Sequence, residues 1–329
     1  MDMNLWFWIG FCVIVVTILA LDLGVFHRHS HRVSVREAMI WSVVWISLAL
    51  AFNYTLYLFE GTERALEFFA GYLLEYSLSV DNIFVFVLVF TYFRVPASYQ
   101  HRVLFWGILT AVLLRGIMIV LGAALLSRFE ILITLFGAFL VYTAVRMARE
   151  DEKEIDIEAN PLVNLLRRFM PITEGYRGQQ FFSFEMGRRL ATPLLVVLLV
   201  VESTDVVFAI DSIPAIFGIT KDPFIVFTSN IFAILGLRSL YFLLAGVIEK
   251  FHYLQIGLSV VLGFVGIKML VESLSSYFMV HAIHFPIQWS LVFIGLVLAT
   301  SVIASLLFPK ASREGHPMVE IKSHADASD

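Results

Sequence analysis

The chain has 329 residues, of which 59% are hydrophobic and 15% are charged, with a formal net charge of −4. Soluble domains are roughly 45–50% apolar and about 25% charged, so this composition excludes an ordinary soluble domain. The few charges exclude a nucleic-acid binder, the aromatic content of 15% excludes a disordered chain, and the single cysteine, Cys12, excludes a disulfide framework.

Stretches of apolar residues along the chain predict a membrane protein, because about 20 residues of helix cross the hydrocarbon core. Nine stretches qualify: residues 4–26, 37–59, 66–92, 103–127, 129–148, 191–219, 223–248, 253–273 and 286–308. The fold class is therefore all-α, a polytopic membrane helix bundle of about nine spans. One transmembrane domain takes up residues 1–310, and residues 311–329 form a polar cytoplasmic tail. The first span lacks a basic segment before it, so we expect it to remain uncleaved.

The distribution of Lys and Arg predicts the orientation of these spans. With the N-terminus outside, 17 basic residues fall in cytoplasmic segments and three fall in outer loops. This asymmetry favours an outer N-terminus and a cytoplasmic C-terminus. The longest loop, residues 149–190, is then cytoplasmic. Within it, residues 161–170 form either a short amphipathic helix on the membrane surface or a solvated linker with an apolar turn.

An internal repeat links the third to fifth spans with the sixth to eighth. Residues 79–84 align with residues 203–208, which places Asp81 on Asp205 at an offset of 124. The next two spans keep nearly the same offset, since Arg115 aligns with Arg238 and Arg146 aligns with Lys268. Three crossings separate the two copies, so they have opposite orientations. Such an inverted repeat is typical of secondary transporters, whose substrate site lies at the repeat interface.

Acidic side chains lie within the spans, although a charge at the bilayer centre costs about 2.5–3.5 kcal/mol. We therefore expect these side chains to face the bundle interior and to hold an ion, a proton or a counter-charge. The candidate metal ligands are Glu75, Asp81, Asn82, Glu202, Asp205 and Asp211. Candidate path or supporting residues are Asp22, Ser79, Ser203, Thr204, Asn230, Arg115 and Arg238. The acids follow one another across the membrane, as a cation or proton path requires.

The candidate ligands are all oxygen donors, which suit Mn²⁺, Mg²⁺ or Ca²⁺ rather than Zn²⁺ or Cu⁺. We expect a transported cation and no permanently bound cofactor. Asp205 and Asp211 are six residues apart, which places them about 120° apart around a regular helix. One ion can therefore not contact both on an unbroken helix. Either the helix bends or unwinds near 206–214, which Pro214 favours, or there are two sites.

Simpler interpretations of the same residues stay open. Arg115 and Arg238 can pair with Asp81 and Asp205 as inert buried ion pairs. The short motif of His27, His29 and His31 resembles a metal site, but it lies at a helix end beside arginines.

Other classes of function are also open. A membrane-embedded metal-dependent enzyme would need acids at the membrane interface, whereas these acids lie within the spans, so we do not expect an enzyme. A metal-loading or assembly factor would dock at the secretion machinery through residues 149–190. The chain shows no ATP-binding motif, so the proton gradient is the expected driving force.

The sequence resembles the TerC family, and most closely its Alx-type members. The resemblance rests on residues 21–27, 71–82, 136–140, 201–217 and 228–238, and it extends over about residues 5–310. It implies a multi-pass protein of the bacterial inner membrane, grouped with LysE-type transporters, that moves Mn²⁺ out of the cytoplasm. The acidic residues of the family motifs fall on Glu75, Asp81, Glu202, Asp205 and Asp211. Partners would be the metal ion, protons and lipid, with an oligomer also possible.

Overall fold

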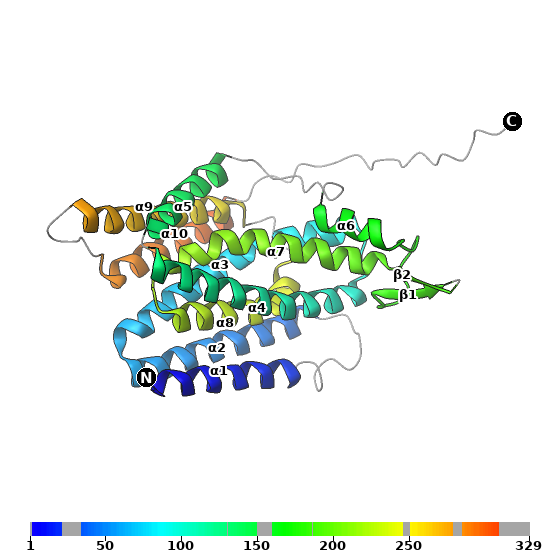
Figure 1. Ribbon diagram of the computed structural model, residues 1–329, viewed down its shortest axis with the longest axis horizontal. Coiled ribbons are helices and arrows are strands. Elements are labelled where there is room, and N and C mark those ends of the chain that lie inside the picture. Colours follow the sequence, from blue (N-terminus) through cyan, green and yellow to red (C-terminus); the bar gives the residue numbers. More distant parts are fainter. Residues whose placement is uncertain are drawn as a thin grey trace.

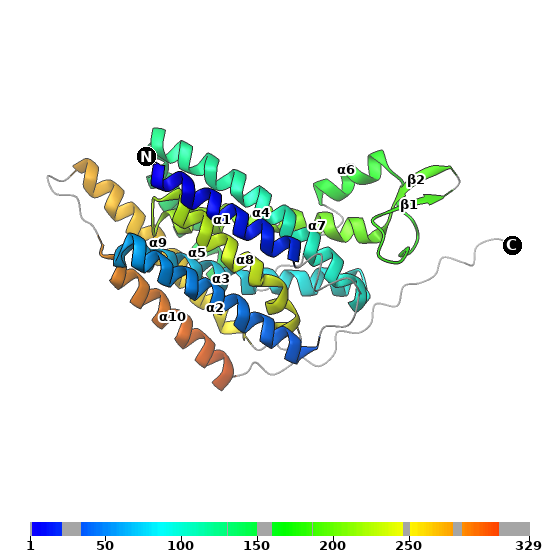
Figure 2. The same ribbon diagram turned by 90° about the horizontal axis from the view of Figure 1, so that it is seen from below.

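The computed structural model describes residues 2–21, 34–129, 131–149, 160–185, 187–245, 251–278 and 285–308. Its long helices pack side by side with their axes roughly aligned, and a smaller lobe lies at one end of the bundle (Figures 1 and 2). The elements are α1 (Asp2–Leu21), α2 (Val35–Glu60), α3 (Thr62–Tyr92), α4 (Ala97–Arg128), α5 (Ile131–Arg149), α6 (Pro161–Phe169), β1 (Phe182–Glu185), β2 (Arg188–Ala191), α7 (Pro193–Phe217), α8 (Pro223–Leu244), α9 (His252–Phe278) and α10 (Ile287–Leu307).

Eight of these helices, α2–α5 and α7–α10, are long and apolar enough to cross a membrane. They coincide with the second to ninth predicted spans, so the prediction of an all-α, multi-pass membrane bundle is confirmed. The first predicted span falls on α1, where residues 8–17 form an apolar stretch within the described side chains. Phe11 of α1 is 2% exposed and packs on Phe52 of α2 and Phe232 of α8.

The helices differ in how much of their surface the bundle covers. In α8, 89% of the most apolar window is buried, against 17% in α5 and 22% in α10. A helix that is apolar all round is suited to a protein core or to a membrane. The central α8 is therefore enclosed by protein, whereas α5 and α10 expose apolar side chains that lipid would cover.

The helices pack in two groups, and the first of them contains the polar residues described below. Helices α3 and α4 both pack on α7 and on α8, which forms an inner group of four helices. Helix α5 packs on α9 beside this group. Gly137 and Gly266 allow their close approach, because a Cβ atom on Gly266 would lie 2.8 Å from the Gly137 carbonyl oxygen.

Helix α7 continues as one α-helix through Pro214 to Phe217. An unwound segment near 206–214 is therefore excluded, whereas the bend that we favour at this point stays a prediction. Proline removes one backbone hydrogen bond, but the surrounding packing keeps the last turn helical. Consequently, residues on α7 keep the regular angular spacing of a helix, and this decides which of its acids face each other.

The segment between α5 and α7 contains α6 and a β-hairpin. Asn160 caps α6 by accepting hydrogen bonds from the backbone N–H groups of Leu162 and Val163, so the helical alternative for this segment is correct. The antiparallel β1–β2 pair follows, with Phe182 opposite Ala191. We did not predict it from the sequence. Residues 150–159 of the predicted loop and the tail 311–329 lie outside the described residues.

Two side chains attach this lobe to the turn between α3 and α4. The Tyr176 hydroxyl donates to the Phe93 carbonyl at 2.8 Å, and the Gln179 amide donates to the Ser98 carbonyl at 3.1 Å. Burial raises the pKa of Tyr176 to about 12, in keeping with a hydroxyl that is packed against the bundle. The lobe is therefore held to the bundle by polar contacts as well as by apolar packing.

Candidate functional site

The polar centre of the bundle is built on one arginine that holds two acids. Arg115 on α4 is 1% exposed. Its Nη2 and Nε atoms donate to the two carboxylate oxygens of Asp205 on α7, at 2.9 and 3.3 Å. Its Nη1 donates to Glu75 on α3 and lies 3.5 Å from the Ser212 hydroxyl oxygen. Two carboxylates from different helices thus share one guanidinium.

The surrounding structure explains why these charges are tolerated. Glu75 is 0% exposed and Asp205 is 5% exposed, so neither carboxylate is solvated by bulk water. A guanidinium presents a planar fork of donors that matches a carboxylate, which makes this pair geometrically specific. Ser212 lies on the same face of α7 as Asp205, two turns later. Ser212 was not among the predicted site residues, because a serine within a span carries no distinctive signal.

Further acceptor atoms close to this centre lack hydrogen-bond partners. Glu202 lies one turn before Asp205 on α7. Neither of its carboxylate oxygens accepts a hydrogen bond of normal geometry from the described residues, because the nearby Thr110 hydroxyl donates to the Trp106 carbonyl at 2.9 Å. Glu75 Oε2 and the Ser79 hydroxyl also lack a partner among the described residues. A buried polar group without a partner is unfavourable, and native proteins keep few of them. These oxygen atoms are therefore candidates to bind something that enters from outside the chain.

A narrow pocket lies beside these acids. Glu202 and Asp205 line it together with apolar side chains of α3, α4, α7 and α8. Gly107 on α4 also lines the pocket, next to Val201 and Glu202. The apolar lining residues are Phe86, Leu104, Ile108, Ala111, Val201 and Leu237.

Asn230 on α8 is a further buried polar residue of the inner helices. It is 0% exposed, and both atoms of its side-chain amide lack a partner among the described residues. One turn before it, Phe227 contacts Gly116, and one turn after it, Ile234 packs against α4. Residues three and four apart share a helix face, so Asn230 lies on the side of α8 that packs on α4.

The other acid of α7 points elsewhere. The Thr143 hydroxyl of α5 donates to Asp211 Oδ1 at 3.3 Å, so Asp211 faces α5, whereas Asp205 faces α4. This arrangement agrees with the alternative of two separate positions. Asp81 is half-buried on α3, and the neighbouring Asn82 is 2% exposed.

The remaining candidates have other roles in the packing. Ser203 and Thr204 donate to backbone carbonyls of their own helix. Arg238 lies 3.4 Å from His101 Nε2 through its Nη1. Of the considered buried ion pairs, the one between Arg115 and Asp205 is present, and Glu75 is a second partner of Arg115. Asp22, His27, His29 and His31 lie outside the described residues.

The acids do not form a ready-made metal centre in this state. Among the described residues, no three His, Cys, Asp or Glu side chains stand close enough to share an ion. The guanidinium of Arg115 instead supplies the positive charge between Glu75 and Asp205.

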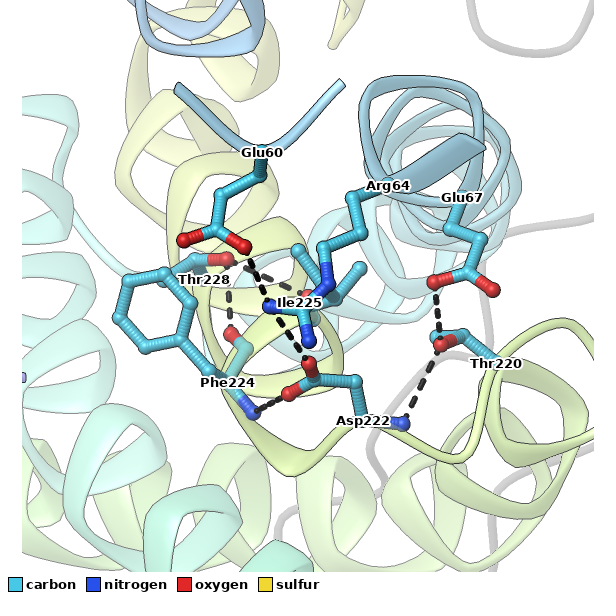
Figure 3. A network of polar contacts seen from close by, with 8 residues as sticks. All are labelled: Glu60, Arg64, Glu67, Thr220, Asp222, Phe224, Ile225 and Thr228. Carbon is cyan, nitrogen blue, oxygen red and sulfur yellow. Dashed lines mark hydrogen bonds and ion pairs between the residues drawn. The ribbon is translucent and has the colours of Figure 1, made fainter. Parts of the chain in front are cut away.

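A second polar network, which the sequence analysis missed, lies at the end of the bundle where α2–α3 and α7–α8 turn (Figure 3). Arg64 bonds Glu60 at 2.8 Å and Asp222 at 3.2 Å, and Asp222 also caps α8. The Thr220 hydroxyl donates to Glu67 at 2.7 Å. The sequence signal is the aspartate before Pro223, which is a typical helix start. This network ties the two turns together.

Comparisons with known proteins agree with this architecture. The pattern of the integral membrane protein TerC family matches residues 60–313. A membrane protein of Myxococcus xanthus is 54% identical over 91% of this chain and 92% of its own length. The Alx protein of Escherichia coli K12, whose name proposes it as a membrane-bound redox modulator, is 47% identical over 90% of this chain and 93% of its own. The thylakoid membrane protein TERC of Arabidopsis thaliana is 46% identical over 79% of this chain and 66% of its own. No solved structure matches the chain.

Proposed function

The chain belongs to the integral membrane protein TerC family, and on this premise we propose that it is a secondary transporter that exports a hard divalent cation in exchange for protons. Mn²⁺ is the first candidate, with Ca²⁺ and Mg²⁺ as the alternatives. In a bacterium the protein would lie in the inner membrane, with an outer N-terminus and a cytoplasmic C-terminus, as the distribution of Lys and Arg favours.

One observation carries this proposal: two buried acids share a guanidinium while neighbouring acceptors have no partner. Glu75 and Asp205 bind Arg115, and both oxygens of Glu202 lack a partner among the described residues. We infer that the guanidinium occupies the place that the cation takes during transport. When the cation enters, Glu75, Asp205 and Glu202 would offer it oxygen ligands, which hard divalent ions prefer.

The helix arrangement supports an inverted repeat of α3–α5 and α7–α9. Helix α3 packs on α8, and its counterpart α7 packs on α4. The third helices of the two copies, α5 and α9, pack on each other. If the two copies are exchanged, the α3–α8 contact becomes the α7–α4 contact, and the α5–α9 contact becomes itself. A two-fold axis that relates the copies requires this pattern. Glu75 comes from the first copy and Asp205 from the second, so their meeting point lies at the repeat interface.

Export of a divalent cation needs an energy source. Moving one elementary charge across 100 mV costs about 2.3 kcal/mol, so expelling a divalent ion against roughly 150 mV costs about 7 kcal/mol. Proton entry can supply this energy if protons and the cation exclude each other at the same carboxylates. A passive pore would let the cation flow inward instead.

The name of the Escherichia coli relative suggests a second candidate, a redox function. This chain has one cysteine, Cys12, so it cannot cycle between a dithiol and a disulfide within itself. We propose that a redox effect in cells would follow from a changed metal content rather than from thiol chemistry of this protein.

Reconstitution into liposomes tests the proposal. Mn²⁺, Ca²⁺, Mg²⁺ and Zn²⁺ are compared as substrates under an imposed pH gradient. We expect gradient-driven Mn²⁺ flux, and we expect Asp81→Asn and Asp205→Asn to abolish it while the protein still inserts. Asp222→Asn, at the far end of the bundle, is the matched control and keeps the flux. Wild-type flux in the Asp205→Asn variant would refute the site. Metal-dependent turnover or a secretion phenotype with no flux would favour the enzyme or the assembly factor.

A further inference from the structure

Helix α6 has one buried apolar face and, beside it, a second apolar face that the protein leaves open. Val163 is 0% exposed, and both it and Leu166 pack against the bundle. Leu162, Leu165 and Phe169 are 38%, 52% and 77% exposed. At about 100° per residue, these three side chains occupy one contiguous stripe next to the buried face. A helix in water would rarely keep such a stripe.

The remaining side of α6 is polar and positively charged. Asn164, Arg167 and Arg168 are exposed and lie opposite the two apolar faces. Two adjacent arginines close to an apolar stripe are typical of helices that lie in the membrane interface, where the stripe meets acyl chains and the cations meet headgroups.

The position of α6 on the bundle also fits the membrane interface. The Asn160 amide donates to the Ser203 hydroxyl at 2.6 Å, which ties the N-terminal end of α6 to α7. Trp106 of α4 is 42% exposed and packs edge-on against Phe181, which lies under the Arg102 guanidinium. Exposed tryptophans beside basic residues mark the boundary between membrane and water. Figure 2 shows α6 lying across the direction of the spanning helices, beside α7, rather than along it.

From these observations we propose that α6 is a membrane-surface helix that binds anionic phospholipids of the adjacent leaflet. Leu162, Leu165 and Phe169 enter the acyl region, and Arg167 and Arg168 bind the headgroup phosphates. Charge complementarity identifies the occupant, because a zwitterionic surface offers the arginines no net attraction. The contact between Asn160 and Ser203 would transmit lipid binding to α7, next to Glu202. The proposal does not depend on the transport function.

Spin labels measure the depth of α6 in the membrane. Cys12→Ser removes the single native cysteine, and Leu165→Cys or Asn164→Cys then places a nitroxide on the apolar or the polar face of the same helix. Oxygen concentrates in the acyl region, whereas a water-soluble nickel complex stays outside it. In lipid nanodiscs we therefore expect oxygen to relax the label at 165 more strongly than the nickel complex does. For the label at 164 we expect the nickel complex to be the stronger relaxing agent. Access of the nickel complex to the label at 165 would overturn the proposal. Dipolar broadening at 165 would do the same, because it would identify a second copy of the chain as the occupant.

The preference for anionic lipid is tested separately. The full-length protein is placed in bilayers with spin-labelled phosphatidylglycerol or phosphatidylcholine, and the motionally restricted fraction of each lipid is measured. Arg167→Gln/Arg168→Gln should weaken the preference for phosphatidylglycerol by about fivefold per removed charge. Arg188→Gln/Arg189→Gln, on the hairpin, removes the same charge and should leave the preference unchanged. Equal effects of the two double variants, or no effect of the first, would refute the headgroup site.

Discussion

Replacing Arg115 by glutamine separates a cation site from an inert ion pair. The change leaves Glu75 and Asp205 buried, at 0% and 5% exposure, without their counter-charge. Removing one partner of a buried pair costs about 3–5 kcal/mol of folding stability. A divalent cation between the carboxylates would replace the lost charge, and a ligand at 100 times its Kd stabilises the folded state by about 2.7 kcal/mol. Saturating Mn²⁺ should therefore restore about half or more of the loss.

The measurement is thermal unfolding of the purified protein in detergent across a titration of Mn²⁺. The wild-type protein should respond less than Arg115→Gln, because its own guanidinium competes for the carboxylates. Arg238→Gln is the matched control, since Arg238 lies beside His101 and not between these acids. Adding Asp205→Asn to Arg115→Gln should abolish the Mn²⁺ response. If Mn²⁺ stabilises Arg115→Gln no more than the wild type, the guanidinium does not occupy a cation position and the reasoning fails.

Four other variants, one of them a matched control, test the surrounding structure. Asp222→Ala removes the cap of α8 and should lower the unfolding free energy by about 1 kcal/mol while Mn²⁺ flux in liposomes stays unchanged. Gly266→Ala places a Cβ atom 2.8 Å from the Gly137 carbonyl and should cost about 1–3 kcal/mol in thermal unfolding, whereas Gly295→Ala, which meets no atom within 4 Å, should not destabilise the protein. Glu202→Gln should change the unfolding temperature little, because a neutral amide of the same size replaces an acid whose oxygen atoms have no partner among the described residues, yet it should lower the flux. A loss of flux in Asp222→Ala or equal destabilisation by the two glycine variants would contradict these assignments.

Most of the fold could be predicted because the free energy of transfer into lipid depends on local sequence. The second to ninth spans follow directly from runs of apolar residues. Helix ends were less predictable: α4 covers Ala97–Arg128, although the apolar run covers 103–127. A helix continues beyond the hydrocarbon core wherever its backbone bonds are satisfied, and hydropathy does not record this. The β1–β2 hairpin has strands of four residues, which are too short to show an alternating pattern.

Sequence reasoning identified the rare charged residues within spans but not which of them meet. Arg115 binds acids that lie 40 and 90 positions away, and the angular register of three packed helices decides these contacts. The angle between Asp205 and Asp211 was predictable from helix geometry alone. Whether α7 bends was not, because the effect of Pro214 depends on the packing around it. The contacts between side chains on different helices therefore could not be predicted from the sequence and come from the three-dimensional structure.

The charges of the central site also predict how many protons accompany each cation. Glu75, Asp205 and Glu202 carry three negative charges when all are ionised, and Arg115 carries one positive charge. One divalent cation or two protons would each neutralise this cluster. A transporter that exchanges these two loads moves no net charge, so the membrane potential neither opposes nor drives export. In liposomes with a fixed pH gradient and a potential set by potassium and valinomycin, the steady-state ratio of Mn²⁺ across the membrane should not change with potential. One net charge per cycle would change that ratio by about tenfold for every 60 mV, and this result would refute the two-proton stoichiometry.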